Sequence, residues 1–177
     1  PMLMDAGGGE SLEAALKRLG TSVEERIDSG YSLVILSDKE TDAEHAALPA
    51  LLAMGAVHHH LVRAGKRHRA GLIIETGEVR EVHHFAALVG YGASGINPYL
   101  VFETLADLAE SGYLPEEMDL QTAIERYITA VKKGLLKVMS KMGVSTLRSY
   151  RGSQIYEAVG LDSDVINRFF TGTASQV

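Results

Sequence analysis

The sequence predicts an α/β fold, with parallel strands and flanking helices in the first half and a mainly helical C-terminal portion. Two short apolar runs with β-branched residues, at 31–36 and 70–74, are typical of strands that are buried on both faces. Each run is followed by a segment with helical spacing, and this alternation indicates parallel strands joined by helices. Beyond Pro98 only helical segments are predicted.

The first predicted element is an amphipathic helix over residues 11–28. Leu16 and Leu19 lie on its apolar stripe, whereas Lys17 takes a polar position. Gly20 leaves open whether this helix is continuous or divided.

The middle of the chain follows a β-α-β-α order and ends in a third strand. Gly65 and Gly90 suit the ends of its two helices, because glycine readily adopts the left-handed conformation found there. Asn97 suits the end of the short third strand, after which Pro98 can begin a helix. In chain order we predict a strand at 31–36, a helix at 46–63, a strand at 70–74, a helix at 81–89 and a strand near 92–96.

The second half is predicted to be helical, with Asp119 and Ser163 as N-caps. Gly134 interrupts the longest of these segments and indicates either a close helix crossing or a break between two helices. The predicted helices lie at 98–110, 119–142, 153–159 and 163–170. We therefore divide the single segment 1–177 into a helical entry (1–30), a β-α-β-α unit (31–98) and a mainly helical part (99–177).

Composition narrows the function classes. With 177 residues, of which 46% are apolar, the chain can bury a core, and one domain is expected at this length. Its 17 basic and 23 acidic residues give a net charge of −6, which disfavours a nonspecific nucleic-acid binder. The apolar runs are far shorter than the ~20 residues of a membrane helix. Cysteine is absent, which excludes disulfides, iron–sulfur ligation and thiolate catalysis by these residues.

Polar side chains follow the predicted strands. Asp38 follows the first strand, Glu75 the second, and Ser94 and Asn97 flank the third. Ligands of α/β proteins bind at the carboxyl ends of strands, where loops gather side chains and helix N-termini point at the cleft. Such residues could serve an independent α/β enzyme in which the carboxylates of Asp38 and Glu75 act on a small metabolite. Alternatively, Asp38 caps the following segment and Glu75-Thr76 forms a turn.

The histidines could suggest a metal site, because all seven fall within residues 45–84. Their spacing argues against one. Consecutive helical residues point about 100° apart, and no histidine has another at the i+3 or i+4 position. We therefore expect packed core or interface histidines rather than metal ligands.

Two further stretches could hold an anion. The run GYGASG at 90–95 contains three glycines, but it follows a helix and leads into a strand, unlike a dinucleotide-binding turn. A close-packed turn is the commoner explanation for such a run. Residues 139–151 gather hydroxyls with Lys141 and Arg151 around a helix end, although the helix dipole or a carboxylate partner would also explain both cations.

Several stretches, taken together, point to a known family. They are VILSD at 34–38, HHHLVR at 58–63, REVHH at 80–84, GYGASGINPY at 90–99, SKMGVST at 140–146 and SYRGSQIYEAVGL at 149–161. In this order, and over nearly the whole chain, they resemble the central domain of the glutamate synthase large subunit. The resemblance implies a degenerate, partial (β/α) barrel that precedes an FMN-binding synthase domain.

In that family, glutamine is hydrolysed in an N-terminal glutaminase domain. The ammonia passes through a tunnel to 2-oxoglutarate in the FMN domain, which also has a 3Fe-4S cluster. The resemblance implies a noncatalytic, cytoplasmic segment that binds no cofactor or metal, scaffolds both neighbouring domains and helps form the tunnel. A small electron-transfer subunit or ferredoxin is the implied further partner, with no nucleic acid and no membrane, and the electron donor is left open.

A conduit needs no nucleophile, but it must exclude water and hold its wall rigidly. Strand ends and helix ends are the natural positions for such a wall. The residues expected to line the tunnel or contact neighbouring domains are Asp38, Glu75, Arg80, His83, Tyr91, Asn97, Ser140, Lys141, Ser145 and Arg151.

Overall fold

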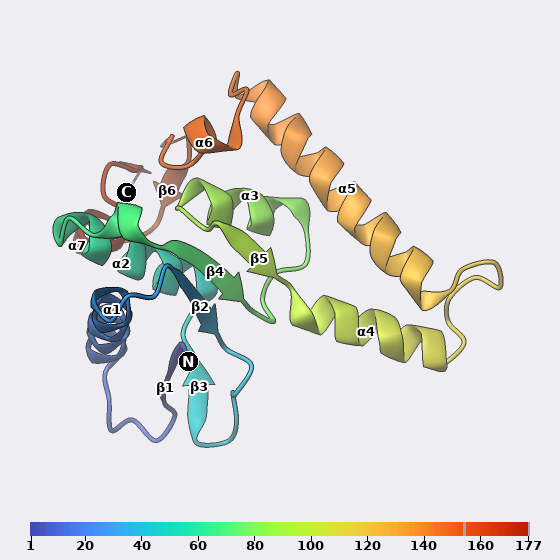
Figure 1. Cartoon of the computed structure of the whole chain (residues 1–177), viewed down its shortest axis with the longest axis horizontal. Coiled ribbons are helices and arrows are strands. Elements are labelled where there is room, and N and C mark those ends of the chain that lie inside the picture. The colour runs from blue at the N-terminus through green and yellow to red at the C-terminus, as the bar shows by residue number, and fades with distance from the viewer. Residues whose placement is uncertain (154, 177) are drawn as a thin grey trace.

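The structure, a computed structural model, describes residues 1–153 and 155–176 and is built on a small parallel sheet (Figure 1). The strands, in spatial order, are β2 (Leu33–Ser37), β4 (Gly71–Glu75) and β5 (Gly95–Asn97). The helices between them are α2 (Ala50–Arg63) and α3 (Val82–Gly90), with a 3-10 turn η1 (Arg67–Arg69) before β4. The predicted order of parallel strands and connecting helices is therefore confirmed.

One face of this sheet is covered by helices. Leu36, Leu72 and Ile74 point into a core shared with α2, α3 and the N-terminal helix α1 (Leu12–Asp28). The helix α1 runs through Gly20 without a break. A Cβ atom at Gly20 would lie 3.0 Å from Cγ of His60, so this glycine allows α1 to approach α2 closely.

In the part of the chain that the structure describes, the opposite face of the sheet is bare. Leu33 and Ile35 are 53% and 57% exposed on it. Strand order follows chain order, so right-handed crossovers place α2 and α3 on the same side. Because parallel sheets are normally covered on both faces, this bare face is an incomplete surface.

A short antiparallel pair, which the sequence did not predict, precedes the sheet. It consists of β1 (Leu3–Asp5) and β3 (His45–Ala47). The helix expected at 46–63 was therefore wrong at its start, because α2 begins only at Ala50. The N–H of Met2 donates to the carbonyl of Ser37, and this bond attaches the pair to the end of β2.

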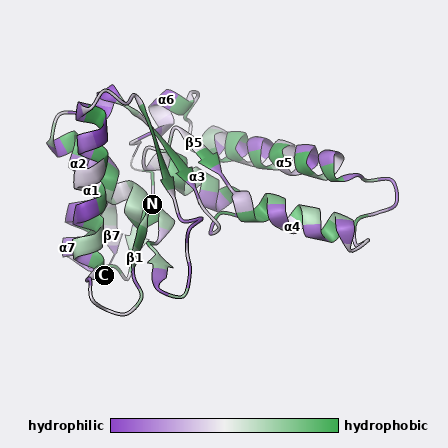
Figure 2. Cartoon of the chain, turned by 60° about the horizontal axis from the view of Figure 1, so that its bottom comes forward, coloured by the Kyte–Doolittle hydropathy of each residue, from purple (hydrophilic) through white to green (hydrophobic). Residues whose placement is uncertain are grey.

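The second half begins with two long helices, which confirm the predictions for 98–110 and 119–142. They are α4 (Tyr99–Glu110) and α5 (Leu120–Lys141), and they form a hairpin that projects from the sheet (Figures 1 and 2). The side chain of Asp119 accepts the N–H of Thr122 at 2.8 Å, which confirms this N-cap. The helix α5 is continuous through Gly134. A Cβ atom at Gly134 would clash with Cγ2 of Val82, so this glycine allows α5 to cross α3 closely.

The C-terminal part differs most from prediction. It contains α6 (Leu147–Tyr150), β6 (Glu157–Val159), α7 (Ser163–Phe169) and β7 (Ala174–Gln176). The helix predicted at 153–159 is wrong: residues 157–159 pair in parallel with β7, and residues 153, 155 and 156 form neither helix nor strand. Gln154 lies outside the described residues. The expectation of no strand after Pro98 was equally wrong, because the partner strand lies far along the chain. The helix at 163–170 is confirmed as α7, but its N-cap is Asp162.

Over the described residues, no helix is long and apolar enough to cross a membrane.

Candidate functional site

Three polar residues form a row at the carboxyl ends of the strands, on the bare face of the sheet. Ser37, Glu75 and Asn97 are register partners on β2, β4 and β5. The two carboxylate oxygens of Glu75 accept the Ser37 hydroxyl at 2.6 Å and the Asn97 amide at 2.9 Å. We call these three residues the strand-end row. It fixes one half-buried carboxylate at the end of an apolar surface.

A second carboxylate lies beneath this row, on the core side. Asp38 is only 3% exposed, and Thr76 donates its hydroxyl to Oδ2 at 2.5 Å. The backbone N–H of Gly77 is 3.2 Å from the other carboxylate oxygen. A buried carboxylate requires such donors, because burial without them is costly. Asp38 therefore joins the loops after β2 and β4, and it does not cap the segment that follows it.

Two residues near the strand-end row were missed by the sequence reading. Burial, together with the neighbouring Asp38 carboxylate, raises the pKa of Tyr99 to about 12. The carboxylate of Glu78 accepts the N–H of Ala50 at 2.9 Å, which satisfies a free donor at the N-terminus of α2. The contact between Glu78 and Ala50 joins residues that are far apart in sequence, so it leaves no local signal. Tyr99, by contrast, closely follows the carboxyl end of β5, and that position is a signal for a site residue in α/β proteins.

The stretch at 80–84 starts a helix. The side chains of Glu81 and His84 form a capping box at the N-terminus of α3. The carbonyl of Arg80 accepts the hydroxyl of Tyr127 at 2.9 Å, and the ring of His83 packs edge-on against Tyr156. In the described part of the chain, no three His, Cys, Asp or Glu side chains are grouped as a metal site would require.

The other predicted residues lie apart from the strand-end row. Tyr91 bonds to Thr173 at 2.7 Å, and Arg151 reaches the carbonyl of Ser94 at 3.5 Å, both at the amino edge of the sheet. Ser94 thus lies before β5, which corrects its expected place among the carboxyl-end residues. The exposed residues Ser140, Lys141 and Ser145 surround the end of α5. The structure therefore brings together Asp38, Glu75 and Asn97, with Arg80 on the loop after β4, and separates the rest.

The glycine-rich run at 90–95 forms a close-packed turn. The guanidinium of Arg67 donates to Nδ1 of His58 at 3.0 Å and to the carbonyls of Ala70 and Gly92, each at 2.7 Å. Burial, together with this neighbouring cation, lowers the pKa of His58 to about 4, so its ring is neutral. Gly92 has a φ of +107° and leaves no room for a side chain against His58. His58 is thus a packed histidine, as the spacing predicted.

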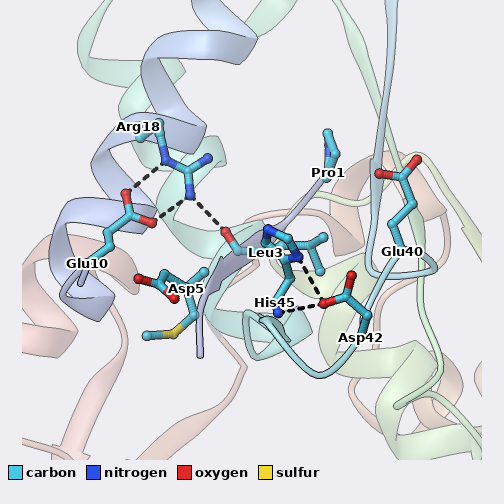
Figure 3. Close-up of a pocket in the computed structure, with 9 residues that line it drawn as sticks. Pro1, Leu3, Asp5, Glu10, Arg18, Glu40, Asp42 and His45 are labelled. Atoms are coloured by element: carbon cyan, nitrogen blue, oxygen red, sulfur yellow. Dashed lines mark hydrogen bonds and ion pairs between the residues drawn. The ribbon is translucent and has the colours of Figure 1, made fainter. Parts of the chain in front are cut away.

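A pocket of about 520 Å³ lies beside the β1–β3 pair (Figure 3). Arg18 forms a two-pronged ion pair with Glu10, and this pairing lowers the pKa of the Glu10 carboxyl. Asp42 bonds to the ring of His45 at 2.9 Å. Asp5 accepts the N–H groups of the following turn. The charged groups mainly satisfy one another, which is typical of a structural cluster.

Comparison with known proteins identifies the family. The family model described as "Glutamate synthase central domain" matches residues 1–162 of the 177. The chain belongs to this family. The central-domain segment is 50% identical over 168 residues to "Glutamate synthase [NADPH] large chain" of Bacillus subtilis, a match that covers 95% of this chain and 11% of the relative.

Further relatives have the same partial coverage. "Glutamate synthase [NADH]" of Schizosaccharomyces pombe is 44% identical, over 93% of this chain and 8% of its own length. "Ferredoxin-dependent glutamate synthase 2" of Synechocystis is 43% identical, over 99% of this chain and 12% of its own length. The central-domain segment thus spans only about a tenth of the length of the curated relatives it matches. Their names include three electron donors, so this region is shared among all three types.

Proposed function

We propose that this central-domain segment is a noncatalytic part of a glutamate synthase. It scaffolds the N-terminal glutaminase domain and the C-terminal FMN domain of the same chain and helps form the ammonia tunnel between them. A small electron-transfer subunit or ferredoxin completes the parent enzyme, which is an oxidoreductase. The family match supports the assignment, and the bare sheet face ending in the strand-end row is the observation that carries the conduit role.

The bare face suits a tunnel wall. Leu33, Ile35 and Ile73 present apolar side chains along it, and such a wall excludes water once another part of the protein covers it. Ammonia that meets bulk water is protonated and lost, so a dry wall favours its transfer. The sequential strand order with helices on one face also supports a partial (β/α) barrel, whose interior this face would line.

The cofactors of the parent enzyme are assigned to its other domains. A 3Fe-4S cluster needs thiolate ligands, and this segment has no cysteine. A flavin phosphate would need free N–H groups, but those of Gly92, Ala93 and Ser94 donate to backbone carbonyls in the glycine-rich turn. The donors available here therefore do not fit either group, and no step of the reaction is assigned to these residues.

The independent small-metabolite enzyme is the weaker alternative. It requires Asp38 and Glu75 to act on a substrate as acid or base. Asp38 is buried and bonded to the loop after β4, and both oxygens of Glu75 accept hydrogen bonds from the neighbouring strands. These contacts favour a structural role for both carboxylates over general acid or base catalysis.

The test is an Asn97→Ala substitution in the full-length enzyme. The substitution removes one hydrogen bond from Glu75, worth ~1 kcal/mol. Because ~1 kcal/mol corresponds to a factor of about five, we expect the amount of glutamate formed per glutamine hydrolysed to fall about fivefold. Glutamine hydrolysis and glutamate formation from added ammonia should be retained. Both yields are measured in one coupled assay.

The matched control is Ser94→Ala, an exposed residue at the opposite end of β5. It should leave the coupling ratio unchanged. Equal loss of hydrolysis and synthesis in the Asn97 variant would indicate general destabilisation and would count against the conduit.

A further inference from the structure

The outer face of α5 bears a row of positive charges. We call Arg126, Lys133, Lys137 and Lys141 the basic stripe. Their spacing of seven, four and four residues places them on one side of the helix, and all four are exposed. Among the described residues none of the four takes part in an ion pair, although the chain as a whole carries a net charge of −6.

A solvated helix face normally mixes both signs of charge. Here Lys133 and Lys137, and then Lys137 and Lys141, are like-charged neighbours at i and i+4, an arrangement that destabilises a helix. The helix dipole compensates a cation only within the last turn, which includes Lys141 but not Lys133 or Arg126. The stripe is therefore unfavourable unless negative charge lies opposite it.

The surface around the stripe suits a close contact. Ala130 and Ser140 are small and exposed between the basic side chains, and Leu136 at the border is 63% exposed. Leu136 can therefore act as an apolar anchor beside the cations of the basic stripe. The complementary surface would have an apolar pocket for the leucine, surrounded by acidic side chains.

We propose that the basic stripe docks onto an acidic surface of the same polypeptide, in a part that lies outside residues 1–177. This inference rests on the proposed function only in assigning the segment to a much longer glutamate synthase chain. The chain covers 11% of its Bacillus relative, so most of a parent polypeptide lies elsewhere.

The size of the stripe favours a tethered partner over a second copy. A helix of 22 residues is about 33 Å long and ~10 Å wide, so its face offers ~330 Å². A stable contact between separate proteins needs about 800 Å² on each side. A partner in the same chain binds at a high effective concentration and can use a smaller contact.

The test is carbodiimide cross-linking of the full-length enzyme, read by mass spectrometry. The reagent joins a lysine amine directly to a carboxylate in contact with it. We expect cross-links from Lys133 and Lys137 to Asp or Glu residues outside 1–177 within one polypeptide. The rate at which an amine reagent labels both lysines should rise about tenfold in high salt, because salt screens the two ion pairs that the lysines form with the acidic surface.

The paired substitution Lys133→Glu/Lys137→Glu should raise hydrogen exchange in α5 of the full-length enzyme. The matched control is Lys17→Glu/Arg26→Glu on the exposed side of α1, with the same charge change and no expected effect on α5. Cross-links between two copies, found by mixing isotopically distinct enzyme, would overturn the proposal. Rapid, salt-independent labelling of both lysines without such cross-links would overturn it too.

The outcome is independent of the conduit test. Failure of the Asn97 coupling experiment would leave the cross-links intact, whereas absent cross-links would leave the coupling ratio unaffected.

Discussion

The two halves of the molecule are held together differently. Residues 1–97 enclose a core in which side chains such as Leu61, Leu72 and Ile74 are fully buried between α1, α2 and the sheet. In the second half, α4 has no buried residue and α5 has only Ala123 and Met139. The first half thus carries its own core, whereas the arm formed by α4 and α5 presents surfaces that need other protein to cover them.

The largest effect expected from this difference is on truncation of apolar side chains. Leu72→Ala should destabilise the first half by ~3 kcal/mol, because it opens a cavity in a packed core. Leu105→Ala, on the half-buried side of α4, should cost less than about 1 kcal/mol. Hydrogen exchange of each region measures both changes. Similar costs at the two sites would contradict the proposed contrast.

The contact between the halves is tested at Gly134, where α5 crosses α3. An alanine would gain up to ~1 kcal/mol in helix propensity, but its Cβ would clash with Val82, and overpacking costs about 1–3 kcal/mol. We expect Gly134→Ala to destabilise the arm by ~1 kcal/mol, seen as faster exchange in α5.

The matched variant is Val82→Ala, which removes the two methyl groups that the new Cβ would meet. Combined with Gly134→Ala, it should restore most of the protection. If the double variant exchanges as fast as Gly134→Ala alone, the crossing is not what limits this position.

The sequence predicted the parts of the fold that depend on local patterns. Periodicity and capping residues located α1, α3, α4 and α5, and the apolar runs located β2 and β4. Strands of three residues, such as β1, β3 and β6, show no usable period, and each exists only because a partner distant in sequence pairs with it.

The candidate site divides in the same way. Placing Asp38, Glu75 and Asn97 after parallel strands was enough to predict that they meet, because carboxyl ends of parallel strands lie at one edge. The bond from Glu78 to α2, and the grouping of Tyr91 and Arg151 at the opposite edge, depend on tertiary packing that no local spacing encodes.

The smallest predicted effect is a pH dependence that belongs to the first half alone. The folded pKa of His58 is about 4, below the ordinary value of 6.5, because the ring is buried and accepts from Arg67. The unfolded chain therefore binds the proton more readily. The stabilisation that the neutral His58 ring gives to the folded state is complete above about pH 6.5 and is lost as the pH falls toward 4. After allowing for solvent screening, we expect the free energy of unfolding to fall by ~1–2 kcal/mol over this range.

Hydrogen exchange of β4 and α2 between pH 6.5 and 4.5 measures this loss. His58→Gln can keep an acceptor for Arg67 but cannot titrate, so it should reduce the dependence of stability on pH in this window. The remaining dependence belongs mainly to His59, because burial lowers the pKa of that ring as well. The carboxyls of Glu24 and Asp42 have lowered pKa values and contribute mainly at lower pH, so they do not obscure the comparison. An unchanged slope in the glutamine variant would show that the His58–Arg67 pair does not control it. A slope of the same size in α4 would show instead that the two halves respond to pH together.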